Sequence, residues 1–406
     1  MTTTGAAIAP SANLATLKYA IRDLAVLAAD VQKQGHPVLY LNVGDPLKFD
    51  FATPPHLIEA VIKAMHDGFN GYAASEGLPA AIAAVRREAD RKGISNIQSV
   101  FITQGVGETV DVCLTALLNP GENILTPSPD YPLYSAVLTK LGIKLNTYEL
   151  DEDNGWQPNL ADIERKITPQ SRGIVLINPN NPTGAIYSRK TLEAIAELAR
   201  KHNLVVFADE IYDKLLLDED APMVAFASIA PDVPCITFGG MSKNYLVPGW
   251  RLGWGIATGG AAAIGNYVEC IHRILRARLS ANLPMQHAIP AALDGPQGHL
   301  VEVNRKLRSR RDLTAAWCAA TPRVSLVAPK AAFYAFAKID IPADANEDDE
   351  TFVKALLQEK HVLVVHGSGF GQRAGTQHFR IVYLPEEKVL TQAYAGISDF
   401  ITARYK

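Results

Sequence analysis

The chain has 406 residues, of which 48% are hydrophobic and 20% are charged. This composition is sufficient for a large buried core and excludes an intrinsically disordered protein. The formal net charge of −3 argues against nucleic acid or an anionic membrane surface as the main partner. At roughly 150 residues per domain, the length predicts about two or three domains.

The N-terminus and the cysteines predict a cytoplasmic protein. The first ten residues, MTTTGAAIAP, have neither the basic segment nor the long apolar run of a signal peptide. No apolar run is long enough to predict a transmembrane helix, so we expect no membrane partner. The cysteines form no C-x-x-C motif, which disfavours a zinc or redox site, and we expect no metal and four buried thiols: Cys113, Cys235, Cys270 and Cys318.

Helical and strand patterns alternate along most of the chain. Apolar residues recur at helical spacing in residues 55–66 and 190–203. Between such segments lie short, nearly continuous apolar runs, as expected of strands that are covered on both faces: 100–103, 123–126, 173–177, 204–208 and 235–238. Alternation of strands and helices is typical of βαβ units, so the sequence predicts an α/β fold with a mainly parallel sheet.

The pattern changes after about residue 296. A charged helix at 304–320 precedes three predicted strands and a terminal helix; the strands are 332–339, 362–365 and 379–384. We expect a smaller α+β domain at 296–406, a large domain at 49–295, and an N-terminal segment at 1–48 that joins the smaller domain. The acidic stretch 344–350 is expected to be an exposed loop that leads into a helix.

The sequence after the first predicted strand suggests an anion site. Gln104, Gly105, Val106 and Gly107 lead into the apolar helix 110–118. Glycines at a strand-to-helix turn let backbone N–H groups approach a phosphate, and the helix dipole favours the negative charge. A purely structural turn would have the same sequence. The segment is neither a G-x-G-x-x-G nor a Walker A motif, which disfavours NAD and ATP.

Two further strand ends carry polar residues. Residues 178–184 read NPNNPTG, which predicts an ordered loop with several free side-chain amides. Asp209 follows the strand 204–208, and a buried acid at that place requires a cationic partner. From this residue alone, a structural ion pair is as good an explanation as a functional acid.

The last strand end supplies an amine. Ser242 and Lys243 follow the strand 235–238, and Arg251 lies shortly downstream. A buried lysine among small residues can have a lowered pKa and act as a nucleophile, while Ser242 and Arg251 suit an anion beside it. A phosphate cradle, a carboxylate, an amide donor and an amine together match the needs of pyridoxal 5′-phosphate.

Four motifs in this order resemble the class I/II aminotransferases, which are fold-type-I pyridoxal-phosphate enzymes: NPNNPTG (178–184), DEIY (209–212), SK (242–243) and GWRLG (249–253). The similarity covers nearly the whole chain. YAIR (19–22), PDYP (129–132), ADEIYDK (208–214) and HFRIV (378–382) look like the bacterial alanine (glutamate–pyruvate) aminotransferase branch. The resemblance implies a large domain with a mainly parallel seven-stranded sheet covered by helices.

The resemblance also implies roles for the cofactor residues. Lys243 would form the aldimine with the cofactor and then carry protons as the general acid and base. Asp209 would pair with the pyridine nitrogen, and Asn181 and Tyr212 would hydrogen-bond O3′. Further cofactor contacts are implied for the ring-stacking Tyr131 and, at the phosphate, for Gly105, Val106, Gly107, Ser242 and Arg251.

Substrate and partner residues follow from the same resemblance. Arg380 would bind the substrate α-carboxylate, with Asn181 beside it, and Gly44 would leave room for the substrate. Tyr72 matches a tyrosine that reaches the phosphate of the neighbouring subunit, which implies a homodimer with shared active sites. The expected reaction is a ping-pong amino transfer from alanine or glutamate to pyruvate or 2-oxoglutarate.

Several alternatives stay open. The segment NYLVP (244–248) looks like the tyrosine aminotransferase branch, and His366 replaces a proline before the glycine-rich loop 367–371, so an aromatic amino donor is possible. A β- or γ-lyase on the same cofactor would share the same residues. A transcription regulator with this domain would need a basic DNA-binding module that the N-terminus lacks. Candidate side-chain pocket residues, each equally compatible with a surface role, are Lys18, Tyr19, Arg22, Arg276 and Arg278.

Overall fold

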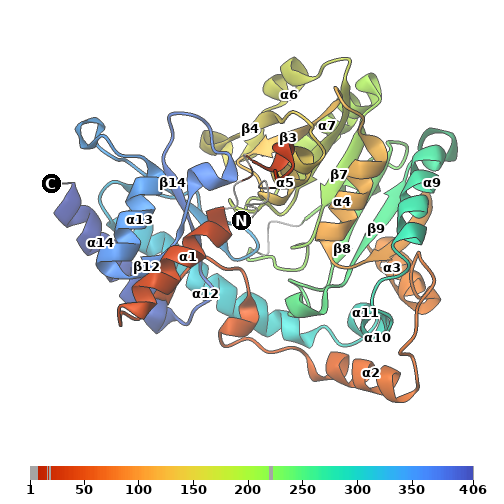
Figure 1. Ribbon diagram of the computed structural model, residues 1–406, viewed down its shortest axis with the longest axis horizontal. Helices are drawn as coiled ribbons and strands as arrows, with labels where there is room; N and C mark the ends of the chain where they lie inside the picture. Colours follow the sequence, from red (N-terminus) through yellow and green to blue (C-terminus); the bar gives the residue numbers. More distant parts are fainter. Residues whose placement is uncertain (1–7, 16, 18–19, 219–222, 406) are drawn as a thin grey trace, which may run out of the picture.

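The structure is a computed structural model that describes residues 8–15, 17, 20–218 and 223–405 (Figure 1). Lys18 and Tyr19 lie outside the described residues, and so does the side chain of Arg22. Within the described residues, no helix combines the length and the apolar character that crossing a membrane would need. Cys113, Cys235 and Cys318 are buried free thiols, whereas Cys270 is a half-buried one, so the expectation of four buried cysteines is wrong at Cys270.

In the described part of the chain, the large sheet has eight strands in the order β2-β9-β8-β7-β6-β3-β4-β5. Neighbours from β8 to β4 run parallel, while β9 is antiparallel to both β8 and β2. The predicted mainly parallel α/β sheet is confirmed. The sheet has one strand more than the expected seven; one of its strands, β5, has only two residues and is too short to leave a pattern in the sequence. The strands are β2 (Ile97–Thr103), β3 (Asn123–Ser128), β4 (Asn146–Asp151), β5 (Gln157–Pro158), β6 (Ser171–Ile177), β7 (Val205–Asp209), β8 (Cys235–Gly240) and β9 (Gly253–Thr258).

Helices cover both faces of this sheet (Figure 1). Successive side chains of a strand point to opposite faces, so Val206 and Ala208 pack into one hydrophobic layer and Phe207 into the other. The Phe207 layer contains α4 (Val106–Leu117), α5 (Leu133–Lys140) and α9 (Ala261–Ala277). The opposite layer contains α3 (Pro79–Arg91), α6 (Leu160–Lys166), α7 (Arg189–His202) and α11 (Ala288–Leu293).

The last third of the chain builds a second sheet, with the described strands in the order β10-β11-β14-β13, all antiparallel. The strands are β10 (Val324–Ser325), β11 (Tyr334–Ile339), β13 (Val365–His366) and β14 (His378–Val382), with helices α12 (Gly298–Ala320), α13 (Asp349–Lys360) and α14 (Glu387–Arg404). The predicted strand 362–365 is divided between β12 (Val362–Leu363) and β13, which belong to different sheets.

The N-terminal segment packs against this second part. Helix α1 (Ala20–Lys33) leads to β1 (Leu39–Tyr40), which pairs in parallel with β12. Figure 1 shows α1 beside α13 and β12, at the end of the molecule that also holds the C-terminus. The predicted domain limits at residues 48 and 295 stay predictions.

The acidic stretch 344–350 differs from its prediction at one residue. Asp348 caps α13 by accepting a hydrogen bond from the Thr351 N–H. Asp349, however, is buried, because its carboxylate accepts hydrogen bonds from Ser368 N at 2.6 Å and Gln372 Nε2 at 2.9 Å. The loop is therefore anchored to the glycine-rich segment that follows His366.

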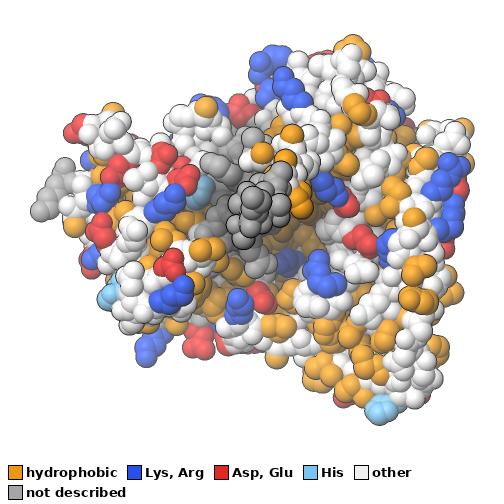
Figure 2. Space-filling model, in the orientation of Figure 1, with side chains coloured by type: hydrophobic (Ala, Val, Ile, Leu, Met, Phe, Trp, Pro, Cys, Tyr) orange, Lys and Arg blue, Asp and Glu red, His pale blue; other side chains and the backbone are white. Residues whose placement is uncertain are grey.

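Helix α2 (Pro55–His66) presents hydrophobic side chains to both sides. Leu57 and Val61 are buried, whereas Ile58, Ile62 and Met65 are 41%, 50% and 42% exposed. Figure 2 shows hydrophobic side chains gathered at the lower right, where Figure 1 places α2. A patch of this kind on the surface of a protein often marks an interaction site.

Candidate active site

A cavity of about 540 Å³ lies at the carboxyl ends of β6 and β7. Ligands of open α/β sheets bind at such strand ends. The structure brings most of the predicted site residues into the wall of this cavity: Gly44, Val106, Gly107, Tyr131, Asn181, Asp209, Tyr212, Ser242, Lys243, Arg251 and Arg380. The wall also includes residues that the sequence did not single out, among them Asp45, Lys48, Pro248 and Tyr334.

Lys243 provides an amine inside the cavity. Its Nζ donates a hydrogen bond to the Gly44 carbonyl oxygen at 2.8 Å and lies 5.6 Å from the centre of the Phe333 ring. Burial, and then the cation of Arg380, lower the pKa of Lys243 to about 8. A sizeable fraction of the amine is therefore neutral near physiological pH, and a neutral amine can act as a nucleophile and accept a proton.

Asp209 provides a buried carboxylate at the end of β7. Its Oδ2 accepts a hydrogen bond from Tyr134 Oη at 2.8 Å, and its Oδ1 accepts one from Ile211 N at 3.3 Å. Burial raises the pKa of Asp209 to about 6, although both hydrogen bonds oppose the rise. No ion pair holds Asp209 in the described structure, so the structural ion pair considered from the sequence is not what fixes this acid. Its charge is available to a cationic ligand group.

Tyr212 shares a hydrogen bond with a residue from the second sheet. The hydroxyls of Tyr212 and Tyr334 are 3.0 Å apart, and their rings meet edge to face. Tyr334 also borders Gly44: a Cβ added there would collide with the Tyr334 hydroxyl and lie 2.8 Å from Phe333 Cε2. Gly44 therefore lets the backbone lie against Tyr334 and Phe333 more closely than a residue with a side chain would allow.

The start of α4 forms the anion-binding end of the cavity. Gly105 precedes this helix with φ of 82°, a conformation that glycine adopts readily. A Cβ added to Gly105 would lie 2.6 Å from Arg251 Nη2, and one added to Gly253 would lie 2.6 Å from Val106 N. The Arg251 guanidinium thus packs directly against the helix N-terminus, where free N–H groups and the helix dipole also favour an anion.

Arg380 is held from several sides although it is almost fully buried. Its Nη2 donates to the Asn42 carbonyl oxygen at 2.6 Å, and its Nη1 donates to Asn181 Oδ1 at 3.1 Å. Its guanidinium carbon lies 4.7 Å from the centre of the Tyr334 ring and 4.6 Å from that of Phe370. The two rings pack against the guanidinium, and the two oxygens accept hydrogen bonds at its edge. Together they fix an orientation that suits a carboxylate ligand.

The NPNNPTG loop is ordered as predicted, but only one of its asparagines reaches the cavity. Asn178 Oδ1 accepts a hydrogen bond from Tyr187 N, and Asn180 Oδ1 accepts from both the N–H and the hydroxyl of Thr183. Only Asn181 belongs to the cavity wall. The expectation of several free amides is wrong because the loop uses two of them to fix its own backbone.

Some candidate residues lie elsewhere. Arg276 pairs with Glu269 on the surface of α9 at 2.7 Å, and Arg278 donates to the carbonyl oxygens of Ser75 and Ile102. Tyr72 is 81% exposed and does not line the cavity of its own chain.

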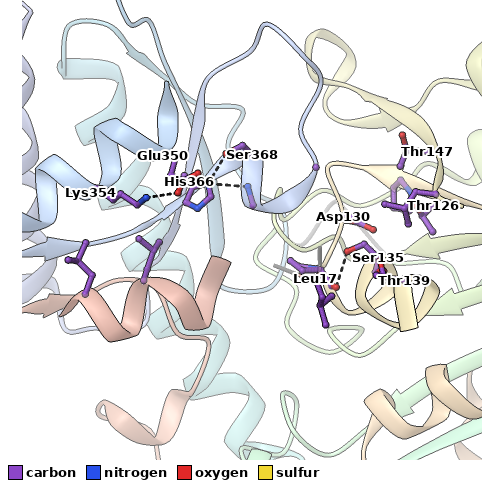
Figure 3. Close-up of a pocket in the computed structure, with 17 residues that line it drawn as sticks. Leu17, Thr126, Asp130, Ser135, Thr139, Thr147, Glu350, Lys354, His366 and Ser368 are labelled. Atoms are coloured by element: carbon purple, nitrogen blue, oxygen red, sulfur yellow. Dashed lines mark hydrogen bonds and ion pairs between the residues drawn. The ribbon is translucent and has the colours of Figure 1, made fainter. Parts of the chain in front are cut away.

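A second cavity of about 580 Å³ contains His366 (Figure 3). Figure 3 shows His366 and Ser368 on one side of it and Asp130 and Ser135 on the other. His366 Nδ1 lies 2.7 Å from Ser368 Oγ, so this ring fixes the glycine-rich loop rather than reaching the active-site cavity. His366 lines this second cavity and not the one that contains Lys243, but its neighbour Val365 pairs with Arg380, so a place for His366 near the substrate pocket stays a prediction.

Two functional tyrosines were missed by sequence reasoning. Tyr134 donates a hydrogen bond to Asp209 and lies three residues after Tyr131, near the start of α5. Its position close to a predicted site residue could have identified it. Tyr334 comes from β11 in the other sheet, and nothing in its local sequence connects it with Tyr212.

Comparison with known proteins identifies the family of the chain. The chain matches the family model of class I and II aminotransferases over residues 36–396. It is 40% identical over 403 residues to the alanine aminotransferase of Mycobacterium tuberculosis H37Rv, with 98% of this chain and 93% of that protein covered. It is 38% identical over 404 residues to the glutamate-pyruvate aminotransferase AlaA of Escherichia coli K12, with 98% and 99% covered. A solved alanine aminotransferase from Pyrococcus furiosus superimposes with a TM-score of 0.93 at 39% identity, covering 97% of this chain and 100% of that one. The chain therefore belongs to the class I and II aminotransferases and is a transaminase.

Proposed function

We propose that this transaminase uses pyridoxal 5′-phosphate to move an amino group between alanine or glutamate and pyruvate or 2-oxoglutarate. The observation that carries the proposal is the arrangement around one cavity of an amine, a carboxylate and two arginines: Lys243, Asp209, Arg251 and Arg380. Transamination needs each of these groups, and a common cavity lets them act on one substrate.

The residues of the cavity fit the cofactor. The helix start beneath Arg251 suits its phosphate, because a guanidinium packs there against free backbone N–H groups. Asp209 carries a carboxylate with no cationic partner in the described structure, which suits a protonated pyridine nitrogen. Tyr212, Asn181 and Tyr131 line the same cavity. Tyr212 and Asn181 would hydrogen-bond the ring oxygen, and Tyr131 would cover the ring face. When bound, pyridoxal 5′-phosphate withdraws the electron pair left when the substrate α-carbon loses its proton.

The chain's own groups supply binding, orientation and proton transfer. Lys243 would hold the cofactor covalently and, once released, would take the proton from the substrate α-carbon and deliver it to the carbon on the other side of the substrate nitrogen. Its lowered pKa of about 8 keeps part of the amine neutral for this task. Arg380 binds the α-carboxylate as a fork, and the rings of Tyr334 and Phe370 hold the fork in place.

The preference for alanine and glutamate rests on the relatives named above, which are alanine and glutamate-pyruvate aminotransferases. The aromatic donor and the lyase remain the competing assignments. The cytoplasmic location likewise stays a prediction from the sequence.

A panel of amino donors tests the proposal. The purified enzyme loaded with pyridoxal 5′-phosphate is offered alanine, glutamate, tyrosine and phenylalanine, each with pyruvate or 2-oxoglutarate as acceptor. We expect the highest kcat/KM for alanine with 2-oxoglutarate and for glutamate with pyruvate. Better turnover of tyrosine or phenylalanine would assign the enzyme to the aromatic branch. Release of ammonia and pyruvate from cysteine without an oxo acid would indicate a lyase.

We further infer that the enzyme is a homodimer in which Tyr72 serves the neighbouring site. Tyr72 is exposed on its own chain, and the exposed face of α2 precedes it in the sequence. The exposed apolar side chains of α2, which are Ile58, Ile62 and Met65, are expected to be covered by a second copy of the chain. We expect sedimentation to give twice the mass of the chain.

Hybrid dimers test the shared site directly. Lys243→Ala subunits and Tyr72→Phe subunits are mixed under conditions that exchange protomers. If Tyr72 acts across the interface, one site of each hybrid combines an intact Lys243 with an intact Tyr72, and activity rises above the average of the two parents. If Tyr72 acts within its own chain, no hybrid site is intact and mixing leaves activity at the average of the parents.

A further inference from the structure

Two buried residues, Glu210 and Asn244, and two half-buried ones, Lys92 and Asp213, form a polar cluster beside the active-site cavity without lining it, here called the Lys92 cluster. Lys92 follows α3, and its Nζ forms ion pairs with Asp213 Oδ2 and, at 3.4 Å, with Glu210 Oε2. The side chains of Glu210 and Asp213 are only 2% and 8% exposed. Buried carboxylates are costly unless a cation meets them, and Lys92 is that cation.

The cluster joins the two segments that carry the reactive groups. Asn244 Nδ2 donates a hydrogen bond to Asp213 Oδ1 at 2.6 Å. Asn244 directly follows Lys243, and Asp213 directly follows Tyr212. The hydrogen bond between Asn244 and Asp213 therefore fixes the backbone at Lys243 relative to the segment that carries Asp209 and Tyr212. Glu210, the neighbour of Asp209, is held by the same ammonium and by Phe226 N at 3.1 Å.

The electrostatics show how strongly Lys92 is engaged. Burial alone would lower the pKa of Lys92, but the carboxylates of Asp213 and Glu210 outweigh burial and raise it, so Lys92 stays charged. Burial raises the pKa of Glu210 to about 7, and the Lys92 charge limits that rise. Without the ammonium, two adjacent carboxylates would face each other in a dry environment, and one would take up a proton or move away.

We propose that Lys92 is a positioning residue, which acts through Asp213 and Asn244 to hold Lys243 at the correct distance from Asp209 and Tyr212. The proposal rests on the proposed function, because the distance matters only if these groups share one cofactor. Displacements of about 1 Å between reacting groups are enough to lower rates by roughly 100-fold.

A neighbouring lysine provides a matched control. Lys214 has the same side-chain exposure as Lys92, 24%, and also pairs with a buried carboxylate, that of Glu88 at 2.6 Å. Within the described part of the chain, its ammonium pairs with Glu88 and forms no hydrogen bond or ion pair with Asp213 or Asn244. Removing Lys92 takes the cation away from Glu210 and Asp213, whereas removing Lys214 leaves Glu88 paired with Arg91 at 2.8 Å. Both variants remove a half-buried ammonium from a carboxylate, but only Lys92 is connected to Lys243 through Asp213 and Asn244.

The enzyme loaded with pyridoxal 5′-phosphate is compared as wild type, Lys92→Met, Lys92→Arg, Asn244→Ala and Lys214→Met. Two quantities are measured: the pH midpoint of the visible absorbance of the bound cofactor, which reports protonation at the Lys243 nitrogen, and the rate of the half-reaction with alanine. Circular dichroism and thermal unfolding record the fold.

For Lys92→Met and Asn244→Ala we expect a shift of the midpoint by at least about 0.5 pH unit. The half-reaction of both should slow by about 10- to 100-fold. Lys92→Arg, which keeps the charge, should recover most of both losses, and Lys214→Met should lose thermal stability while keeping the wild-type midpoint and rate.

The positioning role is overturned if Lys92→Met and Asn244→Ala titrate like the wild type, or if Lys214→Met shifts the midpoint as much as Lys92→Met does. Should Lys92→Met fail to fold, Asn244→Ala decides alone, because it removes the bridging bond and leaves the ion pairs in place. If the wild-type protein itself shows no bound-cofactor absorbance, the proposed function fails first and this inference falls with it.

Discussion

Replacing Lys243 with alanine is expected to reduce transamination by roughly 10⁴-fold, because one change removes both the nucleophile and the proton carrier. The Lys243 amine hydrogen-bonds the Gly44 carbonyl oxygen and lies beside the Phe333 ring, and Lys243 and Gly44 line the cavity, so the variant should fold. Steady-state kinetics with alanine and 2-oxoglutarate gives the loss. Circular dichroism confirms that the fold is kept.

The spectrum separates this role from a mere packing role. The wild-type enzyme should show the visible absorbance of a covalently held cofactor, and Lys243→Ala should lack it even when pyridoxal 5′-phosphate is present in excess. A variant that kept both the absorbance and the turnover would show that another amine does the chemistry.

Replacing Asp209 with asparagine should lower kcat by roughly 10²- to 10³-fold, the usual cost of removing one preorganised electrostatic partner. Asparagine keeps an oxygen that can accept the Tyr134 hydrogen bond, so the packing of the site is preserved. What is lost is the negative charge that, in the proposed function, would keep the pyridine nitrogen protonated. The measurement is the single-turnover rate with alanine, where product release does not intervene.

The same variant should be more stable than the wild type when the cofactor has been removed. Burial raises the pKa of Asp209 from 3.8 to about 6, so the folded state binds this proton more tightly than the unfolded state. Stability from this group is therefore greatest below pH 4 and is lost as the pH rises to about 6. A shift of this size corresponds to roughly 3 kcal/mol, so at pH 8 Asp209→Asn should gain about 1–3 kcal/mol in urea unfolding.

At pH 4 the gain should disappear, because the wild-type carboxyl is then protonated as well. An equal gain at both pH values would mean that the effect comes from packing rather than from the buried charge. Lost activity together with gained stability is the signature of a group that the fold keeps for its function.

Much of the site was predictable because parallel strands end at the same edge of a sheet. Asn181, Asp209 and Lys243 follow the strands β6, β7 and β8, which are neighbours in the sheet. Strand adjacency alone then brings their side chains to one cavity. The nearly continuous apolar runs, which alternate with helical segments along the chain, likewise predicted the α/β class. Such runs are typical of central strands whose sheet is covered on both faces.

The remaining errors have a common physical origin. Tyr334 and the fixed orientation of Arg380 depend on how the second sheet packs against the first, and no local pattern records that contact. Asn178 and Asn180 belong to the same loop as Asn181, but their hydrogen bonds stabilise the local backbone. Composition shows that such residues are present, while only the folded chain shows which partner each one has.

The pairing of β1 with β12 constrains the order in which the molecule can be completed. Leu39 N donates to the His361 carbonyl oxygen, and Leu41 bonds with both Leu363 and Val382, so the segment next to Asn42 and Gly44 finds its partners more than 300 residues later in the sequence. During synthesis, which proceeds at roughly 5–20 residues per second, this segment must remain unpaired for tens of seconds. The carbonyl oxygens that meet Lys243 and Arg380 are therefore the last components to reach the site. A nascent chain can build its central sheet early, but it becomes an enzyme only when its two ends meet.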